Sequence, residues 1–472
     1  MAPRNKLFLG LFIHSTALNE LEYLHNTAVC VDGKGTIVAV EKDCDEDKAK
    51  QTVFPRLGWV EAEVEVVKAE EGQFFFPGFI DTHIHAPQYP NAGIFGDSTL
   101  MDWLDTYTFP LEASFSDLAK AHRIYNRVIR KTLSHGTTCA AYYATIHVPA
   151  TNLLADLCHE RGQRALIGRV CMDQTPPAYY RDESAEASLA ATRASIAHIR
   201  ALDPTHSLIR PIITPRFALS CTFPLLQQLG TLAAETGLPI QTHISENKTE
   251  ITLVKQHFPR SLTGAADDSY AGVYDAAGLL TARTVLAHAV HLTEGEAALV
   301  ARRGAKVSHC PCSNSALGSG AAPVRRLLDR GIGCGLGTDV SGGYSPSVLE
   351  AARQAVLVSR HVVFMGEAGG GRERAKLSVE EALFLATRGG AEVVGLEGRV
   401  GWFGVGMEWD AQLVGLTVVR EDGEVEEGDG GGDVDVFGWE SWPDRVAKWV
   451  YNGDDRNTKQ VWVRGRVVHT RK

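Results

Sequence analysis

The chain has 472 residues, of which 44% are hydrophobic and 22% are charged. These fractions are close to the globular average and exclude a largely disordered chain, a collagen or a coiled-coil rod. The net charge of −10 excludes the basic surface by which proteins bind nucleic acid. Eight acidic residues and no basic one fall within the glycine-rich stretch 421–435, so the rest of the chain is nearly neutral.

Residues 1–77 are expected to form β-structure. The stretch 28–40 alternates around Asp32-Gly33 and Gly35, which predicts a hairpin. Residues 60–67 alternate acidic and apolar side chains with a period of two, which predicts a strand with one solvated face. No apolar run approaches the ~18 residues that a membrane span needs, so we expect a soluble protein without a membrane partner.

Residues 78–398 alternate short apolar runs with helix-like segments. Repeated βα units predict a parallel sheet, and eight of them in one stretch favour a closed (β/α)8 TIM barrel over an open sheet. The motifs of nucleotide-binding folds, GxGxxG after a strand and GxxxxGK[ST], are missing. The predicted strands are 79–85, 137–144, 165–173, 209–214, 239–243, 285–288, 305–309 and 332–338. The predicted helices include 116–134, 185–201, 225–236, 347–358 and one that a capping box opens at 378–381.

Residues 399–472 resemble the first 77 in their pattern, because 410–419 and 460–469 are again strand-like. The acidic insert 421–435 lies between these two runs. Two β-rich ends around an α/β middle are typical of a discontinuous domain. We therefore expect an α/β fold in which a small β-sandwich domain, built from both termini, accompanies the barrel. The nine cysteines form no CxxC pair, which predicts reduced thiols and a cytoplasmic location.

Ionisable side chains end four of the predicted strands, where barrels of this kind carry their active sites. His83 and His85 are two residues apart and so lie on one side of the first strand. His243 ends the fifth strand, His288 ends the sixth, and Asp339 follows the eighth. Each of these residues alone could have a purely structural role, because a lone histidine is often a core residue and such an aspartate is often a helix N-cap. Together they predict one metal site, and their donors suit zinc or iron(II).

The segments around these residues resemble the amidohydrolase superfamily over nearly the whole chain. The matching segments are Phe76-Pro-Gly-Phe-Ile-Asp-Thr-His-Ile-His85, His243-x-x-Glu246, Leu286-Ala-His288 and Gly337-Thr-Asp339. Two-metal members usually carry a carboxylated lysine at the end of strand four, but no lysine occurs between Lys131 and Lys248. The resemblance therefore implies one Zn²⁺ per chain, bound by His83, His85, His243 and Asp339.

Further motifs are similar to those of superfamily members that deaminate guanine. They are His85-Ala-Pro-Gln88, Tyr107-Thr-Phe-Pro110, Thr214-Pro-Arg216-Phe217, Asp339-Val-Ser-Gly-Gly343 and Gly453-Asp-Asp-Arg456-Asn457. This similarity implies hydrolysis of guanine to xanthine and ammonia by a zinc-activated water, in a homodimer. Cys312, where relatives more often carry a polar amide, and the acidic insert are two departures from the family pattern.

The same resemblance assigns roles in catalysis and substrate binding. Glu246 is expected to carry protons to the ring nitrogen and the leaving amine while contacting the substrate. Asp339 is expected to accept the water proton and His288 to orient the nucleophile, and direct contact between His288 and zinc is left open. The residues expected to bind the purine are Gln88 through its amide, Arg216 through its guanidinium and Phe217 by stacking.

Several alternatives stay open at this point. Gln88 could instead tie down the loop after the first strand, and Arg216 could be a structural ion pair. Trp103 and Tyr107 suit packing as well as a pocket wall, and Asp81 is expected to orient a ligand rather than bind the metal. Asp97, His291 and His309 are left unassigned.

Three other functions compete with this prediction. The first is an aminohydrolase of the same superfamily that acts on another purine, a pterin or a triazine. The second is a barrel that has lost catalysis and serves as a scaffold, which the complete ligand set disfavours. The third, the cytidine-deaminase fold, requires H-x-E and P-C-x-x-C motifs that the sequence lacks.

Overall fold

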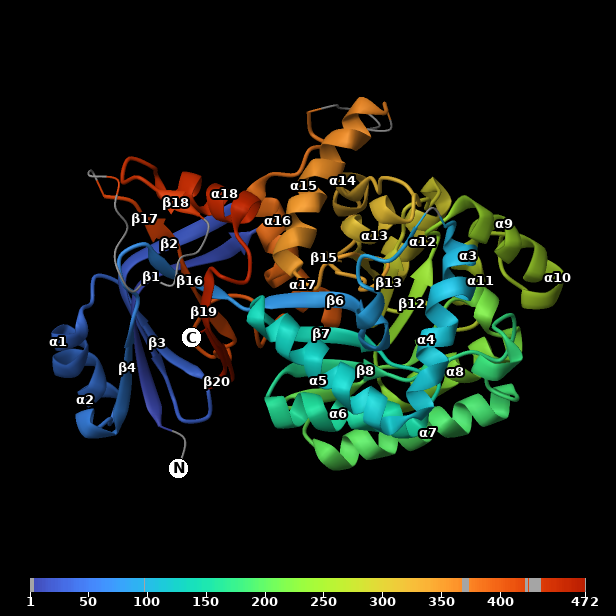
Figure 1. Cartoon of the computed structure of the whole chain (residues 1–472), viewed down its shortest axis with the longest axis horizontal. Coiled ribbons are helices and arrows are strands. Elements are labelled where there is room, and N and C mark those ends of the chain that lie inside the picture. The colour runs from blue at the N-terminus through green and yellow to red at the C-terminus, as the bar shows by residue number, and fades with distance from the viewer. Residues whose placement is uncertain (1–3, 97, 367–372, 421–422, 424–433, 472) are drawn as a thin grey trace.

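The computed structural model describes residues 4–96, 98–366, 373–420, 423 and 434–471 (Figure 1). Asp97 and most of the acidic insert 421–435 lie outside the described residues. The fold has mixed α/β content. The two ends of the chain lie together on one side of the molecule, and the middle of the chain forms the other side (Figure 1).

One eight-stranded sheet combines both ends of the chain. Its order is β20-β19-β16-β5-β1-β2-β3, and β4 pairs with β1. The antiparallel ladder between β5 and β16 joins the two ends, so strands from both termini share one sheet as the sequence predicts. The strands are β1 (Asn5–Ala17), β2 (Glu20–Val31), β3 (Ile37–Glu41), β4 (Val64–Lys68), β5 (Gln73–Pro77), β16 (Ala411–Gly415), β19 (Thr458–Val463) and β20 (Arg466–Thr470). A separate pair consists of β17 (Thr417–Val418) and β18 (Asp435–Val436).

The predicted hairpin at 28–40 is confirmed, and the strand predicted at 60–67 is partly wrong. The antiparallel strands β2 and β3 enclose a turn in which Asp32 accepts backbone hydrogen bonds from Lys34 and Thr36 at 2.9 Å. The other strand begins only at Val64, because its ladder with β1 starts there and residues 61–63 form a 3₁₀ turn. Alternation alone does not tell where pairing begins.

Aromatic side chains fill the core beneath this sheet. Phe8 stacks on Trp409 with ring centroids 4.1 Å apart, and Phe403 stacks on the same indole at 5.1 Å. Trp462 meets Phe8 edge-on at 5.4 Å. Offset and edge-on ring pairs contribute stability beyond the area they bury. The core therefore combines rings from both ends of the chain.

The middle of the chain supplies parallel strands in two four-stranded ladders and one short pair. The ladders have the orders β10-β8-β7-β6 and β12-β13-β14-β15, and β11 pairs with β9. The strands are β6 (Phe79–His85), β7 (Thr137–Tyr143), β8 (Arg164–Gly168), β9 (Val170–Cys171), β10 (Ile209–Pro211), β11 (Thr214–Pro215), β12 (Ile240–Ile244), β13 (Thr284–His288), β14 (Lys306–His309) and β15 (Cys334–Leu336).

Backbone contacts link the two ladders at both ends of the series. A parallel bridge pairs Ile213 with Ile240. On the other side, the N–H of Asp339 donates to the carbonyl of His83 at 2.8 Å, and that of His85 donates to Val340 at 3.1 Å. These contacts place the segment after β15 directly beside β6.

Two strands that the sequence predicts as single runs are each split in two. The run 165–173 divides into β8 and β9, and the run 209–214 divides into β10 and β11. At the interruption, a Cβ on Gly168 would lie 1.8 Å from the hydroxyl of Thr214. The absence of a side chain at Gly168 therefore permits the two strand segments to approach each other here. The pattern of apolar residues does not reveal this approach.

Helices follow most of the parallel strands, and the four helices predicted by range are all present. The capping box is also confirmed, since Ser378 and Glu381 exchange side-chain to backbone hydrogen bonds. The longer helices are α5 (Leu118–Ser134), α6 (Val148–Arg161), α7 (Ala185–Leu202), α8 (Phe223–Thr236), α9 (Lys248–His257), α12 (Glu294–Arg303), α15 (Val348–Phe364), α16 (Val379–Ala386) and α18 (Trp442–Asn452). The shorter ones are α1 (Glu46–Lys48), α2 (Phe54–Leu57), α3 (Leu100–Trp103), α4 (Phe109–Ala113), α10 (Arg260–Thr263), α11 (Tyr270–Ala276), α13 (Pro311–Ala316), α14 (Val324–Leu328) and α17 (Arg388–Val394).

All nine cysteines are buried and free of disulfide bonds, as the sequence predicts. Among the described residues, no helix is long and apolar enough to cross a membrane.

Candidate active site

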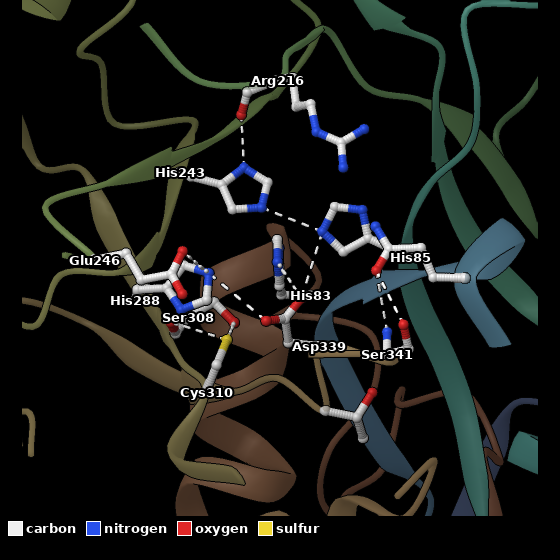
Figure 2. Close-up of polar contacts among 12 residues, drawn as sticks. His83, His85, Arg216, His243, Glu246, His288, Ser308, Cys310, Asp339 and Ser341 are labelled. Carbon is white, nitrogen blue, oxygen red and sulfur yellow. Dashed lines mark hydrogen bonds and ion pairs between the residues drawn. The ribbon is translucent and has the colours of Figure 1, made fainter. Parts of the chain in front are cut away.

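The side chains predicted to bind a metal meet at the ends of four parallel strands (Figure 2). His83 and His85 come from β6, His243 from β12 and His288 from β13, while Asp339 follows β15. One carboxylate oxygen of Asp339 lies 3.1 Å from Nε2 of His83 and 3.4 Å from Nε2 of His85. Its other oxygen lies 3.8 Å from Nε2 of His288. The structure therefore brings all five predicted residues together.

The donor atoms of this cluster fit a metal ion. Those of His83, His243, His288 and Asp339 lie within 4.8 Å of one another. Nε2 of His83 and Nε2 of His288 are buried without a hydrogen-bond partner among the described residues. Buried polar atoms are rarely left unpaired, and a cation would satisfy both nitrogens. His85, a predicted ligand outside this group of four, has its Nε2 only 3.1 Å from Nε2 of His243.

Burial keeps the imidazoles of His83, His85 and His243 neutral, as metal ligation requires. It lowers the pKa of His83 and lowers the pKa values of His85 and His243 well below the ordinary value. For Asp339, burial alone would raise the pKa of the carboxyl group, but the neighbouring His83 and His288 lower it below its usual range. The site thus presents neutral nitrogens and an ionised carboxylate.

Two histidines are oriented by hydrogen bonds from their outer nitrogens. Nδ1 of His243 lies 2.6 Å from the backbone carbonyl of Arg216, and Nδ1 of His288 lies 2.9 Å from the amide oxygen of Asn314. Because both oxygens can only accept, each Nδ1 carries a proton, and the neutral ring of His243 presents the lone pair of its Nε2 to the cluster. Asn314, at α13, was not singled out from the sequence.

The backbone is strained at the strand ends that carry the cluster. Ser245, His288 and Asp339 have φ angles of 49°, 70° and 48°, in the left-handed region that such residues seldom adopt. Strain of this kind gathers at functional sites, where surrounding structure holds it in place. At the same edge, a Cβ on Gly337 would lie 2.7 Å from Cβ of His83, so glycine permits the close approach to β6.

Glu246 lies beside the cluster and is poised to exchange a proton. Burial raises the pKa of Glu246 to about 7. One of its oxygens accepts from the hydroxyl of Ser319 at 3.1 Å, and the other lies 3.5 Å from Nε2 of His288. For His288, burial would lower the pKa, but the charges of Glu246 and Asp339 raise it. A carboxyl group with a pKa near neutrality can both donate and accept protons at pH 7.

The Asp81 side chain supports the cluster by binding backbone N–H groups, and it does not contact the ring of a predicted ligand. One carboxylate oxygen accepts from the N–H groups of His83 at 3.2 Å and Thr338 at 3.0 Å, and the other accepts from the Thr338 hydroxyl at 2.5 Å. It therefore ties the end of β6 to the segment before Asp339. This placement agrees with an orienting role, although the contact is to main chain and not to an imidazole.

The residues predicted to bind the substrate line the same pocket as the cluster. Trp103 also lines the pocket, whereas Tyr107 does not contribute to its wall. Trp103 is buried and its indole N–H donates to the carbonyl of Ile94 at 3.2 Å. The lining side chains from both predicted sets are Gln88, Arg216, Phe217, Glu246, His85, His243, His288 and Asp339.

Gln88 and Arg216 both bind one buried carboxylate, that of Glu112. The Gln88 amide nitrogen donates to Glu112 at 2.7 Å, and the Arg216 guanidinium donates to its two oxygens at 2.5 and 3.1 Å. The amide oxygen of Gln88 accepts from the backbone N–H of Ser341 at 3.2 Å. The structural roles that the sequence left open for these two residues are thus observed, since Gln88 anchors its loop and Arg216 forms an ion pair. Both side chains still line the pocket.

Glu112, which binds two side chains of the pocket wall, is the residue that sequence reasoning missed. It belongs to α4, in an irregular region of short helical turns that no periodicity marks. A buried arginine needs a counter-charge, so Arg216 signals that some acidic partner exists. The sequence does not tell which carboxylate it is, because 104 positions separate the two residues.

The remaining histidines near the site have other surroundings. His291 contacts the carbonyl of Ser319 through Nε2 at 2.7 Å. His309 ends β14, and burial lowers its pKa to about 3. The cysteines at 310 and 312 are absent from the group of donor atoms described above.

Comparison with known proteins identifies relatives along the whole chain. Residues 74–468 match the amidohydrolase family. The chain is 48% identical over 462 residues to a probable guanine deaminase of Schizosaccharomyces pombe, which covers 98% of this chain and 83% of that protein. It is 39% identical over 470 residues to the guanine deaminase of Homo sapiens, covering 99% and 97%. Its fold matches the crystal structure of guanine deaminase from C. acetobutylicum with bound guanine, with a TM-score of 0.83, 31% identity and coverage of 98% and 100%.

Proposed function

This chain belongs to the amidohydrolase family, and we propose that it is a guanine deaminase, which hydrolyses guanine to xanthine and ammonia. The observation that carries this proposal is a single pocket in which the histidine–aspartate cluster faces Gln88, Arg216 and Phe217. The residues suited to hydrolysis and those suited to binding a planar base therefore line the same pocket. The relatives named guanine deaminase support the same substrate.

We infer that the cluster holds one Zn²⁺ per chain, bound by His83, His85, His243 and Asp339. Neutral imidazoles and one carboxylate are the donors that zinc accepts in hydrolytic sites. The unpaired Nε2 atoms of His83 and His288 support a cation at this point, and His288 is close enough to share it. When bound, zinc supplies Lewis acidity that lowers the pKa of a water molecule to about 7.

The protein's own carboxyl groups and His288 would carry the protons of the reaction. Guanine takes up one water, loses its exocyclic amine as ammonia and becomes xanthine, so a proton must move from water to nitrogen. Glu246, with its pKa near 7, is suited to protonate the ring nitrogen and then the leaving amine. Asp339 would accept the proton of the attacking water, and His288 would orient that water.

The pocket wall would recognise the purine by hydrogen bonds and packing. Gln88 and Arg216 offer N–H donors to ring acceptors, and Phe217 supplies an aromatic face at the pocket. Glu246 would contact the edge that carries the amine. Nothing in this wall requires a charged substrate, which suits a small neutral base.

We further infer that the parallel strands close into a (β/α)8 barrel over residues 78–398. The contacts that link β15 to β6, and the bridge at Ile213, support this closure. Residues 1–77 and 399–472 would form a β-sandwich domain, supported by their shared sheet. We also propose a cytoplasmic homodimer that acts in purine catabolism or salvage, for which the free buried cysteines and the family resemblance are the only support.

A substrate panel tests the proposed function. Ammonia release is measured with guanine, adenine, a pterin and a triazine, before and after chelation of metal. We expect turnover of guanine, loss of activity on chelation and recovery on addition of zinc. Turnover of adenine, pterin or triazine in place of guanine would assign the other aminohydrolase function. No turnover of any of them by zinc-loaded protein would revive the scaffold alternative.

A further inference from the structure

Glu112 is a fully buried carboxylate on which several hydrogen-bond donors converge. Its side chain has no exposure to solvent. Gln88 and Arg216 donate to it, and so does the hydroxyl of Tyr180 at 2.7 Å. A buried charge is tolerated only when it is paired and fully hydrogen-bonded, and this one is. Two of its three partners, Gln88 and Arg216, also line the pocket.

Glu112 leaves the Gln88 amide only one orientation. The carboxylate of Glu112 can only accept, and the backbone N–H of Ser341 can only donate. The amide nitrogen must therefore face Glu112, and the amide oxygen must face Ser341. With that oxygen occupied, the free capacity of Gln88 is its second N–H.

Arg216 is arranged in a similar way. Its two side-chain hydrogen bonds both go to Glu112, from Nη1 and Nη2. Three of its five N–H groups remain for other partners. The guanidinium also lies over the ring of Phe109, with its central carbon 5.4 Å from the centroid, so its plane is held from a second direction. The free groups of both side chains are therefore donors.

We propose that Glu112 is a positioning residue that makes this wall of the pocket donor-only and thereby selects a purine that presents a carbonyl oxygen. The inference rests on the proposed function, since it names how that same pocket recognises its substrate. Guanine offers acceptors at its C6 carbonyl and ring nitrogens. Adenine places an amine at C6, and two donors would then face each other. A donor-only wall accepts the first base and rejects the second.

The test replaces Glu112 by glutamine, which has almost the same shape. In either orientation the new NH₂ group faces one nitrogen of Arg216, together with either Gln88 or the hydroxyl of Tyr180, so Arg216 loses one of its two hydrogen bonds and rotates. We expect the KM for guanine to rise about 10- to 100-fold, in keeping with the loss of hydrogen bonds to a charged group. The bound zinc, measured by elemental analysis, should not change.

A second ligand separates positioning from a general structural role. 2-Aminopurine keeps the amine at C2 but lacks the C6 carbonyl. Its affinity, measured as a competitive inhibition constant, should change less than about threefold in Glu112→Gln, because it never used the carbonyl contact. The ratio of guanine to 2-aminopurine affinity should therefore fall at least several-fold. A merely structural defect would weaken both ligands alike.

Glu296→Gln is the matched control. Glu296 is also buried, and its carboxylate accepts from the backbone of Tyr270 and from Thr293, away from the pocket. This variant should lose stability without changing the KM for guanine or the affinity ratio. If Glu112→Gln does not fold, Glu112→Asp keeps the charge but withdraws it by one methylene, and the same rise in KM is expected.

The possible results separate this inference from the proposed function. Wild-type protein that is loaded with zinc and inactive on guanine would refute the proposed function, and the Glu112 inference with it. Active wild-type protein whose Glu112 variants keep the wild-type KM and affinity ratio would overturn the Glu112 inference alone. A rise in KM with an unchanged ratio would overturn it as well, because it would reduce Glu112 to a structural residue.

Discussion

Two buried arginines at opposite ends of the parallel strands have the same chemistry and different surroundings. Arg164 begins β8 and Arg216 follows β11. Arg164 binds Asp410 at 2.9 and 3.1 Å and Glu408 at 2.7 Å, and it also donates to the carbonyl of Ser207 at 2.7 Å. Both guanidinium groups are nearly inaccessible to solvent.

The number of unused donors distinguishes the two arginines. Arg164 makes four hydrogen bonds and joins β8 to the segment that leads into β16, so it attaches the parallel strands to the terminal sheet. Arg216 lines the pocket and, among the described residues, makes two side-chain hydrogen bonds, both to Glu112. In barrels the N-terminal ends of strands contribute stability and the C-terminal ends carry chemistry. The arginine that uses four of its five donors is thus structural here, and the one that uses two is available for recognition.

The largest effect is expected at the C-terminal ends of the parallel strands, where the predicted catalytic residues lie. Glu246→Gln removes the proton carrier without changing the shape of the side chain. We expect kcat for guanine to fall about 10²- to 10⁴-fold, the range typical of a lost general acid–base group. Zinc content and melting temperature should stay near wild type. A variant with nearly normal kcat would remove Glu246 from the mechanism.

The next largest effect is expected at the N-terminal end of the parallel strands, where Arg164 lies. Arg164→Met keeps the volume of the side chain but leaves Asp410 buried without its cation. Breaking a buried pair in this way costs about 3–5 kcal/mol of unfolding free energy, measured by urea denaturation. The KM for guanine should not change in the folded fraction. A raised KM with unaltered stability would contradict the structural role of Arg164.

A pH effect is expected in the terminal sheet. Burial lowers the pKa of His14 to about 4, while its Nδ1 accepts from the backbone N–H of Phe403 at 3.1 Å. The unfolded chain binds a proton at about 6.5, so protonation favours unfolding below that pH. His14 should therefore destabilise the fold increasingly as the pH falls from 6.5 to 4, by about 2 kcal/mol at pH 5.

The variant His14→Gln isolates this contribution from that of other histidines. Urea denaturation of both proteins between pH 4 and 7 should give a shallower pH dependence for the variant. Parallel curves would show that His14 titrates normally in the folded protein.

The smallest effects come from a matched pair of conservative changes. Arg216→Lys and Arg164→Lys keep the charge but lose the fork-shaped pairing of the guanidinium. We expect Arg216→Lys to raise the KM for guanine about 10-fold with zinc retained, and Arg164→Lys to lower stability by about 1–2 kcal/mol with KM unchanged. Metal loss in Arg216→Lys with intact substrate affinity would contradict its assignment to the purine wall.

Much of this architecture is predictable because it is locally encoded. Period-two and helical patterns give most strands and helices, and a spacing of two places His83 and His85 on one side of β6. The strand-end rule then brings His243, His288 and Asp339 to the same edge. These inferences need only the position of each residue along its own strand.

The rest depends on contacts between distant parts of the chain. Glu112 meets Arg216 across 104 positions, and Arg164 meets Asp410 across 246. No local periodicity selects these partners, because hydrogen bonding only requires that some acceptor be near. The split of the run 165–173 has a similar cause, since Gly168 closely approaches Thr214 of the neighbouring run at the interruption. Sequence reasoning therefore finds the histidine–aspartate cluster and misses Glu112, the carboxylate that binds Gln88 and Arg216.

The most direct test of the proposed chemistry is mass spectrometry of the product formed in ¹⁸O-labelled water. Zinc-loaded protein supplied with guanine should yield xanthine that carries one ¹⁸O atom, with one ammonia released per xanthine. Chelated protein should yield none until zinc is restored. Unlabelled xanthine, or no xanthine from zinc-loaded and folded protein, would contradict hydrolytic deamination at this site.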